Sequence, residues 1–122
     1  MPDAVRRWHD RHRLWAVLAV LAALAIAFGS LTAGDEMPSR MPWDKANHFL
    51  GYGGLAGLMG LAGVRPPWAF VAATLYGIVI EYLQIPVPGR SGGDWLDILA
   101  NGLGAATAAL VLLGWRWARR RE

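Results

Sequence analysis

Polar and charged side chains recur at helical spacing in three segments of a chain that is 55% hydrophobic. Residues three, four or seven positions apart lie on one face of a helix, so each segment would present a polar stripe. The stripes comprise Lys45, His48 and Tyr52, then Glu81 and Gln84, then Asp94, Asp97 and Asn101, with Arg90 between the last two groups. We expect these residues to form one ligand-binding pocket.

These residue types could bind a ligand or catalyse a reaction. Arg90 and Lys45 could contact phosphate or carboxylate groups, because ionised donors form strong hydrogen bonds to such oxygens. In an enzyme, Glu81 or Asp97 would be the general base and His48 the acid. His48 and the carboxylates could also hold a divalent metal ion, but no motif fixes a ligand geometry. We therefore predict no metal and no cofactor.

Residues 89–93 match the G-x-S-x-G pattern of a serine nucleophile elbow. That motif works only where a strand turns sharply into a helix, with acid and histidine partners elsewhere in an α/β sheet. Here it follows Ile85-Pro86-Val87-Pro88, at the end of an apolar segment. The sequence therefore argues against a serine hydrolase.

Several of these residues also have a structural explanation. Asp44 precedes an apolar run and could cap a helix. Ser91 and Asp94 have the spacing of a capping box. Lys45 and Tyr52 lie near a predicted membrane interface, where such side chains are common.

Three residues are harder to explain by capping or by the interface. Glu81, Asp97 and Asn101 lie deeper in the predicted helices, and a carboxylate inside a membrane is costly. We expect the three to face one another inside the bundle, within one side chain or one water molecule of Arg90 or His48. The structural alternative for the carboxylates is an internal ion pair with Lys45 or with Arg90.

The elements that would position these stripes are apolar segments long enough to cross a bilayer. Charged residues make up only 17% of the chain, and the first apolar segment holds 18 residues without a charge. About 20 apolar residues cross a bilayer core, and helix is the structure that satisfies their backbone there. We predict an all-α polytopic membrane protein, a bundle of four transmembrane helices in one domain over residues 1–122. The predicted spans are about 14–31, 47–64, 68–85 and 95–115.

The basic residues predict the orientation. One side of the predicted spans carries Arg6, Arg7, Arg11, Arg13, Arg65, Arg116, Arg119, Arg120 and Arg121, and the other side carries Arg40, Lys45 and Arg90. The positive-inside rule then places both termini in the cytoplasm and the polar stripes at the outer interface of the membrane. The first span exceeds the apolar stretch of a signal peptide, so we expect an uncleaved anchor.

Glycine recurs every third residue from Gly51 to Gly63. Small residues allow helix backbones to approach closely in lipid. Gly102, Gly104, Ala106 and Ala108 offer a similar surface on the last span. These surfaces predict packing within the bundle, with a homodimer seam as the alternative.

Four segments, in this order, resemble motifs of the VanZ-like family of small bacterial membrane proteins. They are residues 44–52 (DKANHFLGY), 81–84 (EYLQ), 89–91 (GRS) and 97–104 (DILANGLG), within a match over about residues 43–110. The family is named after a protein associated with teicoplanin resistance, and its members have no defined reaction in general. The resemblance implies a multi-pass protein of the bacterial plasma (inner) membrane with a cell-envelope role, and an outer polar cluster shared by the family.

Two functions remain open from the sequence. The first is a non-catalytic envelope protein that binds a membrane lipid or the head group of a lipid-linked cell-wall precursor, and so affects glycopeptide susceptibility. The second is a membrane-embedded acid/base or metal-assisted enzyme acting on such a lipid. Proton-coupled transport would need a polar path through the inner half of the bundle. That half is apolar in the sequence apart from Thr74 and Thr107, which disfavours transport. Basic residues at the ends of apolar segments favour a membrane, and no nucleic-acid partner is expected.

Overall fold

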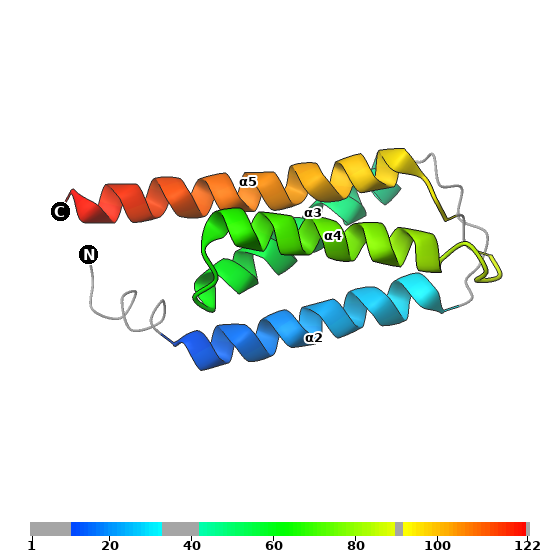
Figure 1. Cartoon of the computed structure of the whole chain (residues 1–122), viewed down its shortest axis with the longest axis horizontal. Coiled ribbons are helices and arrows are strands. Elements are labelled where there is room, and N and C mark those ends of the chain that lie inside the picture. The colour runs from blue at the N-terminus through cyan, green and yellow to red at the C-terminus, as the bar shows by residue number, and fades with distance from the viewer. Residues whose placement is uncertain (1–10, 33–41, 90–91, 122) are drawn as a thin grey trace.

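The computed structural model describes residues 11–32, 42–89 and 92–121, excluding the side chains of residues 42–44. The described residues form an all-helical bundle of four helices, which confirms the predicted fold class at that level (Figure 1). The helices are α2 (His12–Leu31), α3 (Pro42–Leu61), α4 (Pro66–Leu83) and α5 (Trp95–Arg120). They run up and down, so the ends of α2 and α4 and the starts of α3 and α5 lie at one end of the molecule, and the turn 62–65 lies at the other.

The ends of α3 differ from the predicted span. The helix begins at Pro42 and ends at Leu61, where residues 47–64 were expected. The end is fixed by Gly63, whose φ of 110° is left-handed, with Gly63 N bonded to Gly60 O and Val64 N to Met59 O. This is a Schellman arrangement, in which glycine satisfies the last carbonyls of a helix. Pro66 and Pro67 then start α4, because proline fits the first helical turn.

Three of the described helices, α2, α4 and α5, are long and apolar enough to cross a membrane. α3 is not among them, although its 20 residues would reach about 30 Å, because Asp44, Lys45, Asn47 and His48 occupy its first two turns. Large apolar side chains on the outer faces of the other helices are exposed, which is consistent with a lipid environment.

Glycine-mediated packing joins α3 to α5, which form the most extensive helix pair. A Cβ atom at Gly104 would overlap Phe49 O, and one at Gly53 would lie 3.0 Å from Gly104 O. Gly60 likewise makes room for Leu112. The predicted packing within the bundle is confirmed for these glycines. A Cβ atom at Gly54 would have no neighbour within 4 Å, so the homodimer seam stays a prediction.

The core lies between these helices, around the middle of the bundle. It contains Tyr52 and Leu55 of α3, together with buried alanines of α3, α4 and α5. α2 packs mainly on α3, and the Tyr76 hydroxyl donates a hydrogen bond to Ala23 O to connect α4 to α2. The small alanines allow four helices to surround one aromatic pair, Tyr52 and Tyr76, whose ring centroids are 6.3 Å apart.

Candidate functional site

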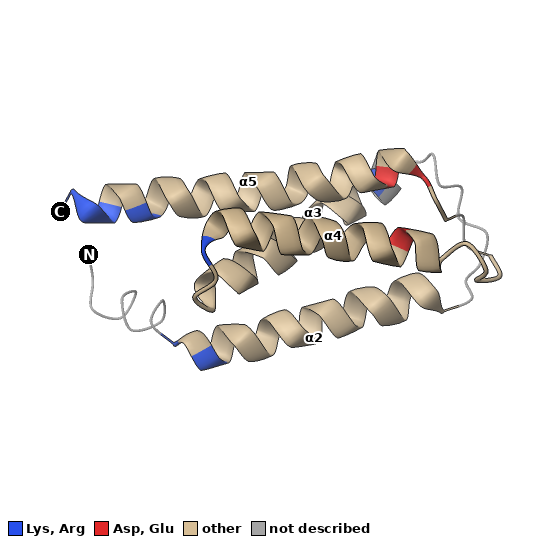
Figure 2. Ribbon diagram, in the orientation of Figure 1, with Lys and Arg blue, Asp and Glu red and all other residues tan. Residues whose placement is uncertain are grey.

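Charged residues are segregated to opposite ends of the bundle (Figure 2). All described arginines lie at the end that holds the 62–65 turn and the start of α2. The carboxylates of Glu81, Asp94 and Asp97 lie at the other end, together with Lys45. This arrangement places the predicted polar stripes at one depth, and we call the group of Lys45, His48, Glu81, Gln84, Asp94, Asp97 and Asn101 the polar cluster.

Lys45 is the positive centre of the cluster. Its Nζ forms ion pairs with Asp97 Oδ1 and, at 3.1 Å, with Asp94 Oδ2. Asp97 is 3% exposed, so its charge needs this partner more than the charge of Asp94 does. The structural alternative for Asp97, an internal ion pair with Lys45, is therefore present in the fold.

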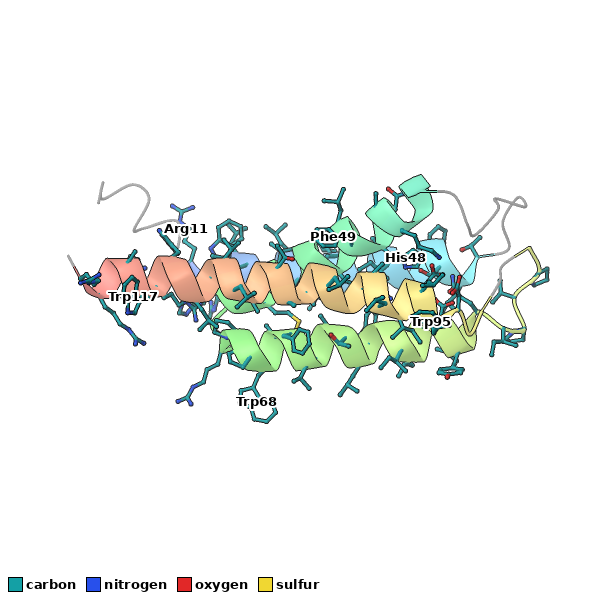
Figure 3. The ribbon with its side chains drawn as sticks, turned by 90° about the horizontal axis from the view of Figure 1, so that it is seen from above. Arg11, His48, Phe49, Trp68, Trp95 and Trp117 are labelled. Atoms are coloured by element: carbon teal, nitrogen blue, oxygen red, sulfur yellow. The ribbon has the colours of Figure 1, made fainter. Side chains whose placement is uncertain are left out.

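His48 connects the ion pair to Asn101. Its Nδ1 lies 2.9 Å from Asn101 Oδ1, and its Nε2 lies 3.6 Å from Asp97 Oδ2. A carboxylate on one side and a carboxamide on the other hold the imidazole ring in one orientation. Figure 3 shows His48 at the same end of the bundle as Trp95, the first residue of α5.

Glu81 has a structural partner in the segment before α5. Its Oε1 accepts a hydrogen bond of 2.9 Å from Asp94 N, and its carbonyl oxygen accepts one of 3.2 Å from Gly93 N. A Cβ atom at Gly92 would lie 2.7 Å from Glu81 O, so only glycine fits this approach. Glu81, at 1% exposed, therefore anchors the start of α5 to the end of α4.

Asp94 is the N-cap of α5, and its Oδ1 accepts a hydrogen bond of 2.9 Å from Leu96 N. The predicted capping box with Ser91 as the cap is wrong, because α5 begins at Trp95. Burial by itself would raise the pKa of Asp94, but the hydrogen bonds from Lys45 and from Leu96 N outweigh it and hold the pKa below its usual value. Asp44 lies inside α3 rather than before it.

Of the predicted site residues, Gln84 points to α2 and Tyr52 points into the core. Gln84 Nε2 donates a hydrogen bond of 3.1 Å to Ser30 O of α2. Tyr52 is 4% exposed and belongs to the core rather than to an interfacial belt, which corrects the structural explanation from the sequence. Arg90 and Ser91 lie outside the described residues.

Two buried polar atoms of the cluster have no hydrogen-bond partner among the described residues. They are Gln84 Oε1 and Asn101 Nδ2. Unsatisfied buried groups are costly, and each one is a position where a ligand or a water molecule would be stabilising. Gly77 of α4 makes room for Asn101, since a Cβ there would lie 2.8 Å from Nδ2.

A groove of about 330 Å³ between α2 and α3 leads to the cluster. His48 and Tyr52 line one side of it together with Asn47, and Gly29 and Ser30 line the other. Ser30 O also accepts the hydrogen bond from Gln84 of the cluster. A ligand lying along α2 could therefore contact His48 without entering the core.

Sequence reasoning missed three residues that shape this site. Gly77 and Ser30 lie in apolar spans without a polar periodicity, and Asn47 lies beside the stripe of His48 rather than on it. The available signal for Gly77 was a lone glycine in an apolar helix, which often marks a close packing contact. Among the described residues, no three His, Asp or Glu side chains gather in a geometry that would hold a metal ion.

No family model, no curated protein and no solved structure matches the chain. The geometry of the polar cluster and its groove is therefore what bears on function.

Proposed function

We propose that the chain is a multi-pass protein of the bacterial inner membrane that binds the head group of a lipid-linked cell-wall precursor at the outer leaflet. The observation that carries the proposal is the polar cluster, in which Glu81, Gln84, Asp97 and Asn101 are buried and His48 of α3 lines an open groove. Ionisable residues inside a membrane bundle are costly and generally serve a function. The resemblance of its segments to the VanZ-like family supports the same role, with an effect on susceptibility to teicoplanin-type glycopeptides.

The proposed topology has four spans, with α3 as the second and both termini in the cytoplasm. α3 has 20 residues, and only residues 62–65 separate it from α4. α3 packs against α5, α2 and α4. The end rich in arginine would face the cytoplasm by the positive-inside rule, which places the polar cluster at the outer leaflet.

The charges of the polar cluster favour a head group rich in hydroxyl and amide groups, such as a sugar. Lys45 is already paired with two carboxylates, and Glu81 adds a third titratable carboxyl group. A phosphate would be repelled by this set. In the proposal Arg90, in the loop before α5, contacts the phosphate, while His48, Gln84 and the groove contact the neutral groups.

Binding of purified protein to lipid-linked cell-wall intermediates tests this proposal. Native mass spectrometry would compare the intermediate with the same polyprenyl phosphate without its sugar. We expect saturable binding of the sugar-bearing lipid and recovery of that lipid unchanged. Binding should be about five- to tenfold weaker for His48→Phe, because one buried hydrogen bond to a ligand is worth roughly 1–1.5 kcal/mol. The control is His12→Phe, the same substitution at the opposite end of the bundle. Equal binding of both lipids, or of wild type and His48→Phe, would refute the proposal.

A second function, a membrane-embedded acid/base enzyme, is favoured by one observation. His48 lies between Asp97 and Asn101, which is the arrangement of a base oriented by a carboxylate, and it lines an open groove. Asp97 would orient the ring and offset the charge of a protonated His48. Chemical conversion of the lipid in the same incubation, lost in His48→Phe, would replace the binding proposal with this one.

A further inference from the structure

Another groove of the described structure lies at the arginine-rich end, away from the polar cluster. It has a volume of about 730 Å³ and lies between the start of α4 and the last turns of α5. Three arginines line it: Arg65 directly precedes α4, and Arg116 and Arg120 are one turn apart on α5. Leu110 and Leu113 line the side nearer to the middle of the bundle, and Trp117 lines the groove in the last turn of α5.

The positive charge of this groove is not balanced by the described residues. Arg116 and Arg120 are four residues apart on one helix, where like charges repel. Every carboxylate whose side chain is described lies at the other end of the molecule (Figure 2). Arg116 donates one hydrogen bond to Gly60 O, and Arg65 forms no side-chain cap on α4. An anion between the three guanidinium groups would remove this repulsion.

The apolar wall has the character of a surface for an acyl chain. Leu110 and Leu113 are 68% and 42% exposed on consecutive turns of α5, which is a span by its length and composition. Trp117 lies one turn further, at the end of the helix, where tryptophan marks the membrane interface. The groove therefore places a cationic site at the level of the lipid phosphates and an apolar surface directly beneath it.

We propose that this groove is a binding site for an anionic glycerophospholipid. The guanidinium groups of Arg65 and Arg120 hold the phosphate with planar pairs of donors, and an acyl chain lies along Leu110 and Leu113. Basic pockets between transmembrane helices on the cytoplasmic side bind anionic lipid head groups for this reason. The proposal needs the chain to cross the membrane and does not depend on a ligand at the polar cluster.

Lipid binding in detergent tests the site, because no bilayer surface potential is present there. Native mass spectrometry would measure the affinity for phosphatidylglycerol and for phosphatidylcholine. We expect the variant Arg65→Gln/Arg120→Gln to bind phosphatidylglycerol about 25-fold more weakly, from about fivefold for each arginine. The matched control is Arg13→Gln/Arg119→Gln, which removes the same charge from the same end of the bundle outside the groove. Its affinity should stay within about twofold of wild type.

Three results would overturn the proposal. One is equal weakening in the control variant, which would show that only the total charge matters. Another is equal affinity for phosphatidylcholine. The third is displacement of phosphatidylglycerol by glycerol 3-phosphate at similar concentrations, which would show a site for free phosphate esters and no role for the apolar wall. If the double variant does not fold, the single variant Arg120→Gln gives the same comparison with an expected loss of about fivefold.

Discussion

At the scale of single residues, Lys45 sets the charge balance of the polar cluster. It is the partner of buried Asp97 and of Asp94, and it is itself partly exposed. Removal of one member of a buried ion pair leaves the other charge uncompensated, which costs more than the pair itself is worth. The same physics explains why a carboxylate is tolerated in the first turn of α5.

Lys45→Met is expected to lower the free energy of unfolding by about 3 kcal/mol, the lower end of the range for a broken buried pair, because Lys45 is partly exposed. Thermal unfolding in detergent would measure the loss. The double variant Lys45→Met/Asp97→Asn should recover part of the stability, since residue 97 then carries no charge. No recovery would show that Lys45 stabilises the fold by packing and not by pairing with Asp97.

Asp94 makes the bundle sensitive to acid. Its pKa is lowered in the fold, so the folded state is favoured by the ionised form. This stabilisation is fully present above the unfolded pKa of about 3.9 and is lost as the pH falls through the lower pKa of the folded state. Asp94→Asn keeps a good N-cap but removes the charge. The variant should therefore lose less thermal stability than wild type between pH 5 and pH 3, measured in the same detergent; an unchanged slope would contradict this.

At the scale of elements, the crossing of α3 and α5 positions the cluster. Gly104 allows the backbone of α5 to approach Phe49 O, and this contact lies between the levels of His48 and Tyr52. The register of the two helices at that point determines whether Lys45 meets Asp97 and whether His48 meets Asn101. A change in the crossing would therefore alter the site without any change in its polar residues.

Gly104→Ala is expected to destabilise the bundle by about 1–3 kcal/mol, because the added methyl group overlaps a backbone oxygen that has little freedom to move. Gly54→Ala is the matched control, since a Cβ there meets nothing within 4 Å. Its expected effect is neutral to slightly stabilising, as alanine is the better helix former. Thermal unfolding of both variants in detergent tests this prediction. Equal unfolding midpoints for the two variants would show that α3 and α5 do not pack as closely at Gly104 as this contact requires.

At the scale of the whole molecule, the separation of charges predicts how the bundle lies in a membrane. Both described ends of the chain, at Arg11 and Arg121, lie at the arginine-rich end (Figures 2 and 3). The C-terminal ends of α2 and α4 lie at the other end. This asymmetry is the physical basis of the proposed orientation.

Cysteine labelling tests that orientation directly, because the chain has no cysteine of its own. Single cysteines at Thr32 and Pro88, both exposed in the structure, should react with a membrane-impermeant reagent on whole cells. A cysteine at Arg121 should react only after permeabilisation. The opposite pattern would move the polar cluster to the cytoplasmic face, and labelling of Thr32 without Pro88 would contradict four spans.

The sequence alone determined the helical class, the approximate helices and the residues of the polar stripes. These follow from local physics: apolar length, proline and glycine at helix ends, and a spacing of three or four residues between polar side chains. The burial of Glu81, Asp97 and Asn101 was also predictable, because a carboxylate is not stable against lipid.

Only the tertiary structure decided which polar residues are partners. The sequence left Lys45 and Arg90 as equal candidates for the ion pair, and it assigned no role to Gly77 or to Ser30. Pairing depends on the register between helices far apart in the chain, and that register is set by close contacts such as Gly104 with Phe49. The groove lined by Arg65, Arg116 and Arg120 could not be predicted from the sequence for the same reason. Arg65 and Arg120 are 55 residues apart in sequence, and they line one groove because α4 begins where α5 ends.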